Sequence, residues 1–220
     1  MKRVVFIVEG DTELNFIHKR VIPYLYNKGY TQSMNAQKIL TNRKLNKKGG
    51  NVSYNYLKNE IVKVAATREV LITTFLDFFR LPTDFPSYTT DRLKLAEIEE
   101  AIRTDLDPQV PSNTLLPYIQ LHEMEALMYT NMDGFDLVVD DEQQLDELRE
   151  IIDRYPNPEE INGGADTAPS KRLMSIFPYR KTTDGEMILE CIEIDDIRAK
   201  CPRFDAWMSK LENGLKNDLF

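Results

Sequence analysis

Three short apolar runs, each ending in polar residues, set the framework of this sequence. Residues 3–8, 70–75 and 115–121 are rich in β-branched and other apolar side chains, which is typical of buried strands. Between them, apolar positions recur every three or four residues, as in amphipathic helices. The clearest helix is expected to follow Asp11 as its N-cap, with a kink at Pro23. Strands alternating with helices predict an α/β fold with a parallel sheet flanked by helices on both faces.

The strand signals weaken in the second half of the chain. Residues 142–155 and the segment around Trp207 show helical spacing, and a short helix is expected to be capped by Ser170. We therefore expect an α/β core in residues 1–135 and a mostly helical extension, residues 136–220, packed on that core. Trp207 is interpreted as a core residue of the extension.

Composition narrows the class of protein. The net charge is −8 and the pI is about 5.0, which argues against broad coating of nucleic acid by the whole surface but leaves room for one basic patch. The two cysteines, Cys191 and Cys201, form no C-x-x-C pair, so neither a disulfide framework nor a zinc knuckle is indicated. The apolar runs are too short for a membrane span and the start is unlike a signal peptide, so a cytoplasmic location is expected.

Acidic residues follow each predicted strand. Glu9, Asp77 and Glu123 stand at or just past the strand ends, and Glu13 lies one helical turn after Glu9. Because ligands in open α/β sheets bind beyond the carboxyl ends of the strands, we expect Glu9, Asp77 and Glu123 to gather within about 4–9 Å of each other. Carboxylate oxygens suit Mg²⁺ or Mn²⁺. Taken singly, each residue is equally well explained as a helix cap or a solvated turn.

Two basic regions are candidates for phosphate contacts, although a solvated charged surface is the commoner role for such residues. The candidates for nucleic-acid binding are Arg43, Lys44, Lys47, Lys48, Lys171, Arg172 and Lys181. The pair His122-Glu123 begins like a zinc-protease motif, but the second histidine is missing because position 126 is Ala126. Glu125 is expected to be a surface residue.

The segment Val8-Glu9-Gly10-Asp11-Thr12-Glu13 resembles the V-E-G-x-T-E opening of Toprim domains, particularly those of overcoming-lysogenization-defect-type nucleases. The whole chain resembles a bacterial family known as domain of unknown function 4276. Four further segments carry that resemblance, in order along the chain: Asp77-Phe78-Phe79-Arg80-Leu81-Pro82, His122-Glu123-Met124-Glu125-Ala126-Leu127, Ala168-Pro169-Ser170-Lys171-Arg172-Leu173 and Cys201-Pro202-Arg203-Phe204-Asp205-Ala206-Trp207.

The resemblance implies a Toprim-like (Rossmann-like) fold, with Glu9 as acid/base or metal ligand and Asp77 holding magnesium. It also implies a partner ATPase encoded nearby, in a restriction or phage-defence locus. One departure concerns Phe79, which stands where Toprim nucleases carry the second Asp of Asp-x-Asp, so that Glu123 or Asp84 would have to supply the further ligand. The leading function is a divalent-metal-dependent nuclease acting on DNA or RNA. The alternatives are a non-catalytic nucleotide- or nucleic-acid-binding regulator of the ATPase, and a structural adaptor.

Overall fold

The computed structural model describes residues 3–42, 47–48, 52–161, 164 and 166–216. By packing, the chain forms two compact units: unit 1 is Met1–Ile119 with Ser209–Phe220, and unit 2 is Gln120–Met208. The sequence predicted an α/β core in residues 1–135 and a helical extension in residues 136–220. That domain boundary stays a prediction.

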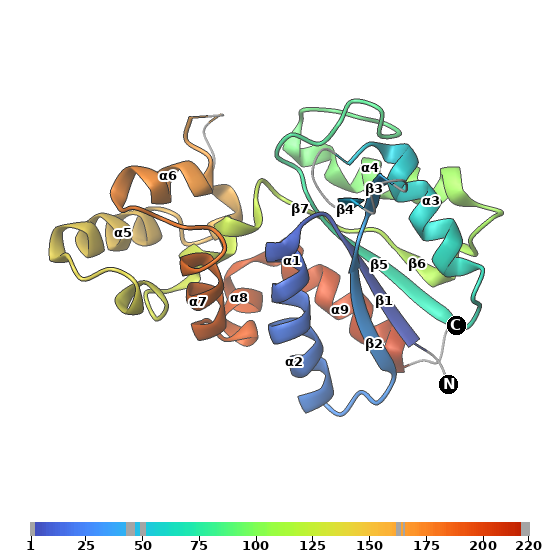
Figure 1. Cartoon of the computed structure of the whole chain (residues 1–220), viewed down its shortest axis with the longest axis horizontal. Coiled ribbons are helices and arrows are strands. Elements are labelled where there is room, and N and C mark those ends of the chain that lie inside the picture. The colour runs from blue at the N-terminus through green and yellow to red at the C-terminus, as the bar shows by residue number, and fades with distance from the viewer. Residues whose placement is uncertain (1–2, 43–46, 49–51, 162–163, 165, 217–220) are drawn as a thin grey trace. The chain divides into compact units, whose positions relative to one another are not determined.

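Unit 1 is built on a parallel sheet. Its strands run in the order β2-β1-β5-β6, and β7 also pairs with β5 (Figure 1). The strands are β1 (Arg3–Val8), β2 (Ser33–Lys38), β5 (Val70–Asp77), β6 (Leu115–Leu116) and β7 (Ile119–Gln120). β1 is parallel to both β2 and β5, and β6 is parallel to β5. The predicted α/β class with a parallel sheet is therefore confirmed. A separate antiparallel pair joins β3 (Leu40–Asn42) to β4 (Lys47–Lys48).

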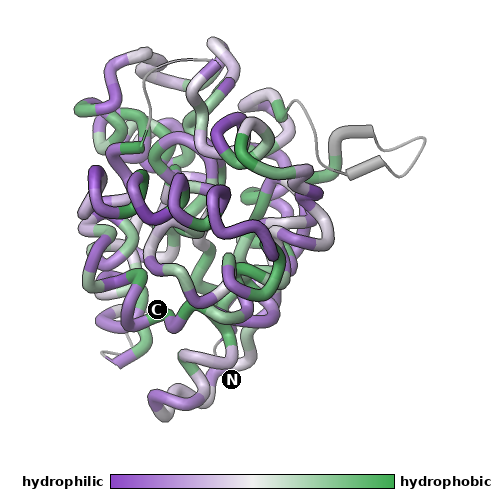
Figure 2. The backbone as a smooth tube through the Cα atoms, turned by 90° about the vertical axis from the view of Figure 1, so that its left-hand side faces the viewer, coloured by the Kyte–Doolittle hydropathy of each residue, from purple (hydrophilic) through white to green (hydrophobic). Residues whose placement is uncertain are grey.

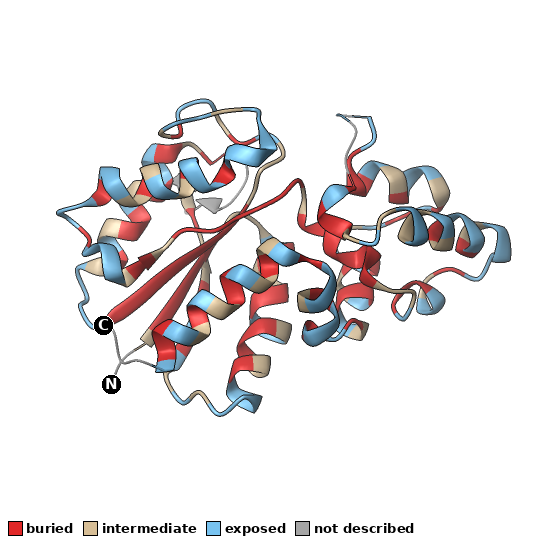
Figure 3. Cartoon of the chain, turned by 180° about the vertical axis from the view of Figure 1, so that it is seen from behind, coloured by how far each residue is buried: buried red, intermediate tan, exposed pale blue. Residues whose placement is uncertain are grey.

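The central strands are the most buried part of unit 1, as their red colour in Figure 3 shows. Phe6, Ile72 and Phe75 are fully buried. The Phe75 ring packs at a tilt against Phe16, with centroids 5.9 Å apart, and against Tyr118, at 5.5 Å. Near-continuous apolar strands fit a sheet covered on both faces, because no strand position then faces water.

A continuous helical run follows β1. It consists of α1 (Asp11–Phe16), the π-helical turn η1 (Ile17–Val21) and α2 (Ile22–Asn27). The N-cap is Gly10, so Asp11, expected as the cap, is instead the first helical residue. The irregularity lies just before Pro23, where the wide π turn fits a proline that supplies no backbone N–H.

The other long helices of unit 1, α3 (Tyr54–Ala65) and α4 (Leu95–Leu106), are amphipathic. Two short 3₁₀ turns, η2 (Arg92–Lys94) and η3 (Ser112–Thr114), have no buried residue. In α4, Leu95, Ile98 and Ile102 recur at helical spacing and are fully buried. Figure 2 shows the resulting alternation of hydrophilic and hydrophobic positions along the helical parts of the chain.

The predicted strand at residues 115–121 is divided into β6 and β7. Pro117 lies between them and cannot donate to a strand ladder. The Thr74 hydroxyl replaces backbone partners there: it donates to the Tyr118 carbonyl at 2.8 Å and accepts from the Tyr118 N–H at 2.8 Å. Thr73 likewise donates to the Leu116 carbonyl at 2.8 Å. Two buried threonines thus hold the interrupted strand against β5.

Unit 2 is helical and is organised around η4, whose residues are all buried. Packed on η4 are α5, η6, α6, α7 and α8. The elements are η4 (Met124–Thr130), η5 (Phe135–Leu137), α5 (Glu142–Arg154), η6 (Pro158–Glu160), α6 (Pro169–Ile176), α7 (Asp184–Cys191), α8 (Ile194–Lys200) and α9 (Pro202–Lys216), the last of which begins in unit 2 and ends in unit 1. Phe204 and Trp207 are buried with ring centroids 5.5 Å apart, which confirms Trp207 as core.

Candidate functional site

The Glu9 and Asp77 positions lie at the same edge of the sheet. β1 and β5 are parallel neighbours, with Val8 opposite Phe75 at the end of the shared register. Glu9 comes directly after β1, and Asp77 is the last residue of β5. Both residues are half-buried. Glu9 and Asp77 therefore stand at the carboxyl ends of two adjacent parallel strands, as a shared site requires.

Glu13 lies against the turn that follows Glu9. Its side chain is buried, in the first turn of α1. A Cβ atom built on Gly10 would lie only 2.6 Å from the Glu13 Oε2 atom. Because real Cβ atoms do not approach an oxygen so closely, the missing side chain at Gly10 gives the Glu13 carboxylate its place. The V-E-G-x-T-E segment thus brings a third carboxylate to the Glu9 turn.

A cation from the edge strand balances part of this acidic turn. The Lys38 ammonium, at the end of β2, lies 2.6 Å from the Asp11 Oδ1 atom. The Asp11 side chain is largely exposed, so the pair contributes little to stability. Its position matters more, since β2, β1 and β5 all end at this edge. Lys38 was not among the candidate residues expected from the sequence, although it stands at the end of a strand as Asp77 does.

Asp84, a candidate for the missing second acidic ligand, has a structural contact. Its Oδ2 atom accepts a hydrogen bond from the Tyr54 N–H at 2.9 Å. Tyr54 is the first residue of α3, whose own N-cap, Ser53, makes no side-chain capping bond. Asp84 therefore caps α3 from a distant part of the chain.

Glu123, the other candidate, caps a helix of unit 2. Its two carboxylate oxygens accept from the Ser170 N–H and the Ser170 hydroxyl, each at 3.0 Å. Ser170 was expected to cap α6, but it lies inside the helix, and the N-cap residue Ala168 has no side-chain capping bond. The negative charge of Glu123 also suits the positive end of the helix dipole. Glu123 belongs to unit 2, and its expected gathering with Glu9 and Asp77 stays a prediction.

Within the part of the chain that the structure describes, no group of three or more His, Cys, Asp or Glu side chains is arranged to hold a metal ion. The chemistry of Glu9, Glu13 and Asp77 nevertheless fits a hard divalent cation, since all three supply carboxylate oxygens at one edge of the sheet. These three residues are the candidate site.

A second polar cluster lies inside unit 2. Glu125 is fully buried, which overturns the expectation of a surface residue. The reason is that η4 is the centre of unit 2 rather than a surface helix. The Lys181 ammonium lies 2.9 Å from the Glu125 Oε1 atom. Burial raises the pKa of the Glu125 carboxyl, and the charge of Lys181 acts in the opposite direction.

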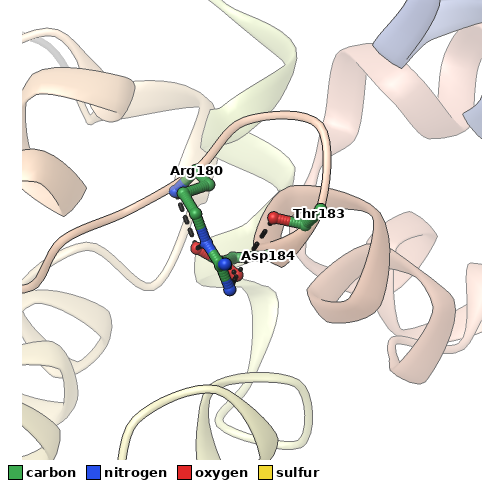
Figure 4. A network of polar contacts seen from close by, with 3 residues as sticks. All are labelled: Arg180, Thr183 and Asp184. Atoms are coloured by element: carbon green, nitrogen blue, oxygen red, sulfur yellow. Dashed lines mark hydrogen bonds and ion pairs between the residues drawn. The ribbon is translucent and has the colours of Figure 1, made fainter.

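The neighbouring Arg180 is also held by a carboxylate (Figure 4). The buried Asp184 accepts from the Arg180 backbone N–H at 2.7 Å and from its guanidinium at 2.7 Å, and the Thr183 hydroxyl donates to it at 3.3 Å. The hydrogen bonds from Arg180 lower the pKa of Asp184. The consecutive cations Arg180 and Lys181 therefore each pair with a buried carboxylate of unit 2, Asp184 and Glu125 respectively.

The expected basic residues do not share one environment. Arg43 and Lys44 lie outside the described residues, and Lys47 and Lys48 are described only as strand β4. Lys171 is exposed on α6. The Arg172 guanidinium donates to the Thr167 carbonyl at 2.9 Å and lies 5.7 Å from the centre of the Tyr155 ring. Lys181 is the ion-pair partner of Glu125. Of the residues whose side chains are described, Lys171 best fits the expected exposed cation.

Five residues other than glycine have positive φ angles in the described chain, and two of them lie near candidate carboxylates. Arg80, three residues after Asp77, has φ 63°, and His122, next to Glu123, has φ 68°. The left-handed region is costly for residues with a Cβ atom, and such strain gathers at functional positions. The sequence does not predict a positive φ angle at Arg80 or His122, because no glycine marks a turn beside either residue.

No helix of the described chain is long and apolar enough to cross a membrane. Searches of the curated proteins and of the solved structures gave no significant match. A family model described as Domain of unknown function (DUF4276) matches residues 8–212, which include the acidic turn of unit 1 and both polar clusters of unit 2. The chain therefore belongs to the DUF4276 family.

Proposed function

We propose that the protein is a divalent-metal-dependent phosphodiester hydrolase acting on DNA or RNA. The single observation that carries the proposal is the common edge of Glu9, Glu13 and Asp77. The sequence resemblance to Toprim nucleases adds the reaction class and the expected setting, a bacterial restriction or phage-defence system with a partner ATPase.

In this proposal Asp77 and Glu13 hold Mg²⁺ or Mn²⁺, and Glu9 acts as ligand or as acid/base. Bound there, the ion would polarise the scissile phosphate and make a bound water more acidic. Glu9 is half-buried, in the turn that leads to the Glu13 carboxylate. The basic residues singled out in the sequence stay separate candidates for phosphate contacts, and Lys171 is the exposed one among those whose side chains are described.

The experiment is a cleavage assay on DNA and RNA with the partner ATPase present, comparing the wild type with Glu9→Gln. Glutamine keeps the shape of the side chain but carries no charge and exchanges no proton, so we expect a loss of activity of at least about a hundredfold. Glu97→Gln is the matched control, because Glu97 is exposed on α4 and is not one of the three candidate site residues. A Glu9→Gln protein as active as the wild type would exclude the mechanism.

The second candidate function is a non-catalytic regulator of the ATPase that binds nucleotide or nucleic acid. One observation favours it: Phe79 replaces the second Asp, while Asp84 and Glu123, the substitutes, both cap helices. A carboxylate committed to a helix cap has fewer lone pairs left for a metal. The regulator is supported if the wild type with its partner binds nucleic acid in Mn²⁺ without cleaving it.

A further inference from the structure

Two exposed apolar side chains of unit 2 flank the contact between η5 and α7. Leu137, in η5, is 62% exposed, and Met187, in α7, is 45% exposed. η5 and α7 pack closely: a Cβ atom on Gly134, the residue before η5, would lie 2.5 Å from the Ile188 Cα atom. Leu137 and Met187 are each within three residues of this backbone contact. Single exposed apolar residues are ordinary, but these two flank one packed contact, and together they are called the apolar patch below.

The patch is bordered by an unusually acidic segment. Residues 131–148 contain no Lys, Arg or His and seven acidic residues, all exposed: Asp133, Asp136, Asp140, Asp141, Glu142, Asp146 and Glu147. Leu137 lies in the middle of this segment. An apolar centre with a mainly acidic rim is the form of a protein-binding surface whose partner carries the opposite charge.

The protein itself contains an example of what this segment binds. The Arg149 guanidinium lies 2.7 Å from Asp146, 3.6 Å from Glu142 and 4.0 Å from Asp136. One arginine thus draws on three carboxylates of the segment. Asp133 and Asp140, four residues before and three residues after Leu137, are further exposed carboxylates that a guanidinium from another molecule could bind.

From these observations we propose that Leu137, Met187 and the acidic segment 131–148 form a docking surface for a partner protein segment with apolar and basic side chains. This inference is independent of the proposed hydrolase activity. Nucleic acid and anionic membranes do not fit, because their phosphates would meet the carboxylates. A second copy of this chain does not fit either, since a symmetric contact would bring two acidic segments together.

The test uses a synthetic amphipathic peptide with leucines on one face and arginines beside them, and a twin in which glutamate replaces each arginine. Binding to the full chain is measured by fluorescence anisotropy at low and high salt. We expect the arginine peptide to bind, the affinity to fall with salt, and the glutamate twin not to bind. Leu137→Ser should weaken binding by about tenfold or more, because it removes the apolar centre. Asp133→Asn combined with Asp140→Asn should reduce the salt dependence.

Two matched controls separate the patch from the rest of unit 2. Met174→Ser removes an exposed methionine, 51% exposed, on α6. Asp153→Asn removes a carboxylate at the far end of α5, about 16 Å along the helix from Glu142. Neither control should change the affinity. The proposal fails if the arginine peptide does not bind, if its glutamate twin binds equally, or if Leu137→Ser and Met174→Ser behave alike. It fails as well if sedimentation shows self-association that Leu137→Ser abolishes, since the occupant would then be a second copy.

Discussion

At the scale of single residues, Gly10 controls where the Glu13 carboxylate lies. The backbone at Gly10 is extended, with φ −129° and ψ −172°, which alanine adopts easily. Gly10→Ala should therefore leave the free energy of unfolding within about 1 kcal/mol of the wild type. The new Cβ atom would nevertheless displace the Glu13 carboxylate, because it would stand 2.6 Å from the Oε2 atom. We expect Mn²⁺ affinity, measured by calorimetry, to fall about tenfold.

The control for Gly10→Ala is a second change that makes room for the new methyl group. Glu13→Asp shortens the acidic side chain by one methylene, so the double variant should recover part of the lost Mn²⁺ affinity. An unchanged affinity in Gly10→Ala would remove Glu13 from the candidate metal site. A large loss of stability would show instead that the turn, rather than the carboxylate, had been disturbed.

A second residue-scale prediction concerns the buried Glu125. Burial raises its pKa, so between the unfolded value near 4.5 and the folded value the native state binds more protons than the unfolded state. Stability due to this group therefore falls as the pH rises through that window. Lys181 opposes this effect, and its side chain is 41% exposed. Lys181→Ala should cost about 1–3 kcal/mol, less than for a fully buried pair, and more at pH 8 than at pH 5.

Chemical denaturation at the two pH values measures that difference directly. In a Glu125→Gln background the carboxylate is absent, so the pH dependence of the Lys181→Ala effect should vanish. Equal destabilisation at both pH values in the single variant would contradict a charged Glu125. Sequence alone could not find this pair, because the spacing of Glu125 on a helix says nothing about which elements cover it.

At the scale of elements, three helices begin with a carboxylate from elsewhere in the chain. Asp84 caps α3, Glu123 caps α6, and Glu159 accepts from the Arg203 and Phe204 N–H groups at 2.9 and 3.1 Å at the start of α9. Glu159 is buried, and burial raises the pKa of its carboxyl. Such remote caps use the same chemistry as a local N-cap but also join distant segments of a unit.

The remote caps predict which acidic substitutions lower stability and which lower metal affinity. Asp84→Ala and Glu123→Ala each remove a helix cap, so each should lower the metal-free unfolding free energy by about 0.5–2 kcal/mol. Asp77→Ala should leave metal-free stability nearly unchanged and abolish Mn²⁺ binding. Thermal melts with a chelator and calorimetry with Mn²⁺ give the two readings. If Asp77→Ala lowers the unfolding free energy without metal as much as Asp84→Ala does, Asp77 is a structural residue.

Elements with strong internal patterns were predictable, and those decided by distant partners were not. β1 was predicted at its observed bounds, and α5 within one residue, because apolar periodicity and burial agree there. Glu125 was expected on the surface, whereas η4, the 3₁₀ segment that contains it, is buried throughout. Asp84 and Glu123 looked like ligands because a sequence gives the position of a carboxylate but not the N–H groups that it accepts from.

At the scale of the whole molecule, the end of the chain completes the unit in which the chain begins. Residues 209–220 belong with residues 1–119, and residues 120–208 form the other unit. The pattern of α9 predicts one apolar face, but a face alone does not say which unit it covers. This is why the sequence could propose a helical extension without indicating that its last turns belong to unit 1.

The last turns of α9 should therefore support the sheet of unit 1. Leu211 is fully buried and Leu215 nearly so, and the Gln32 side-chain amide donates to the Leu215 carbonyl at 3.1 Å. Leu211→Ala should cost about 2–5 kcal/mol through lost burial and the cavity left behind. Hydrogen exchange of the β1 and β5 amides measures this loss of stability inside unit 1, and their protection should drop by at least about thirtyfold.

Asn213→Ala, on the exposed face of the same helix, should leave that protection unchanged, because it removes no buried apolar surface. If Leu211→Ala leaves the β1 and β5 amides as protected as Asn213→Ala does, the end of α9 does not stabilise unit 1.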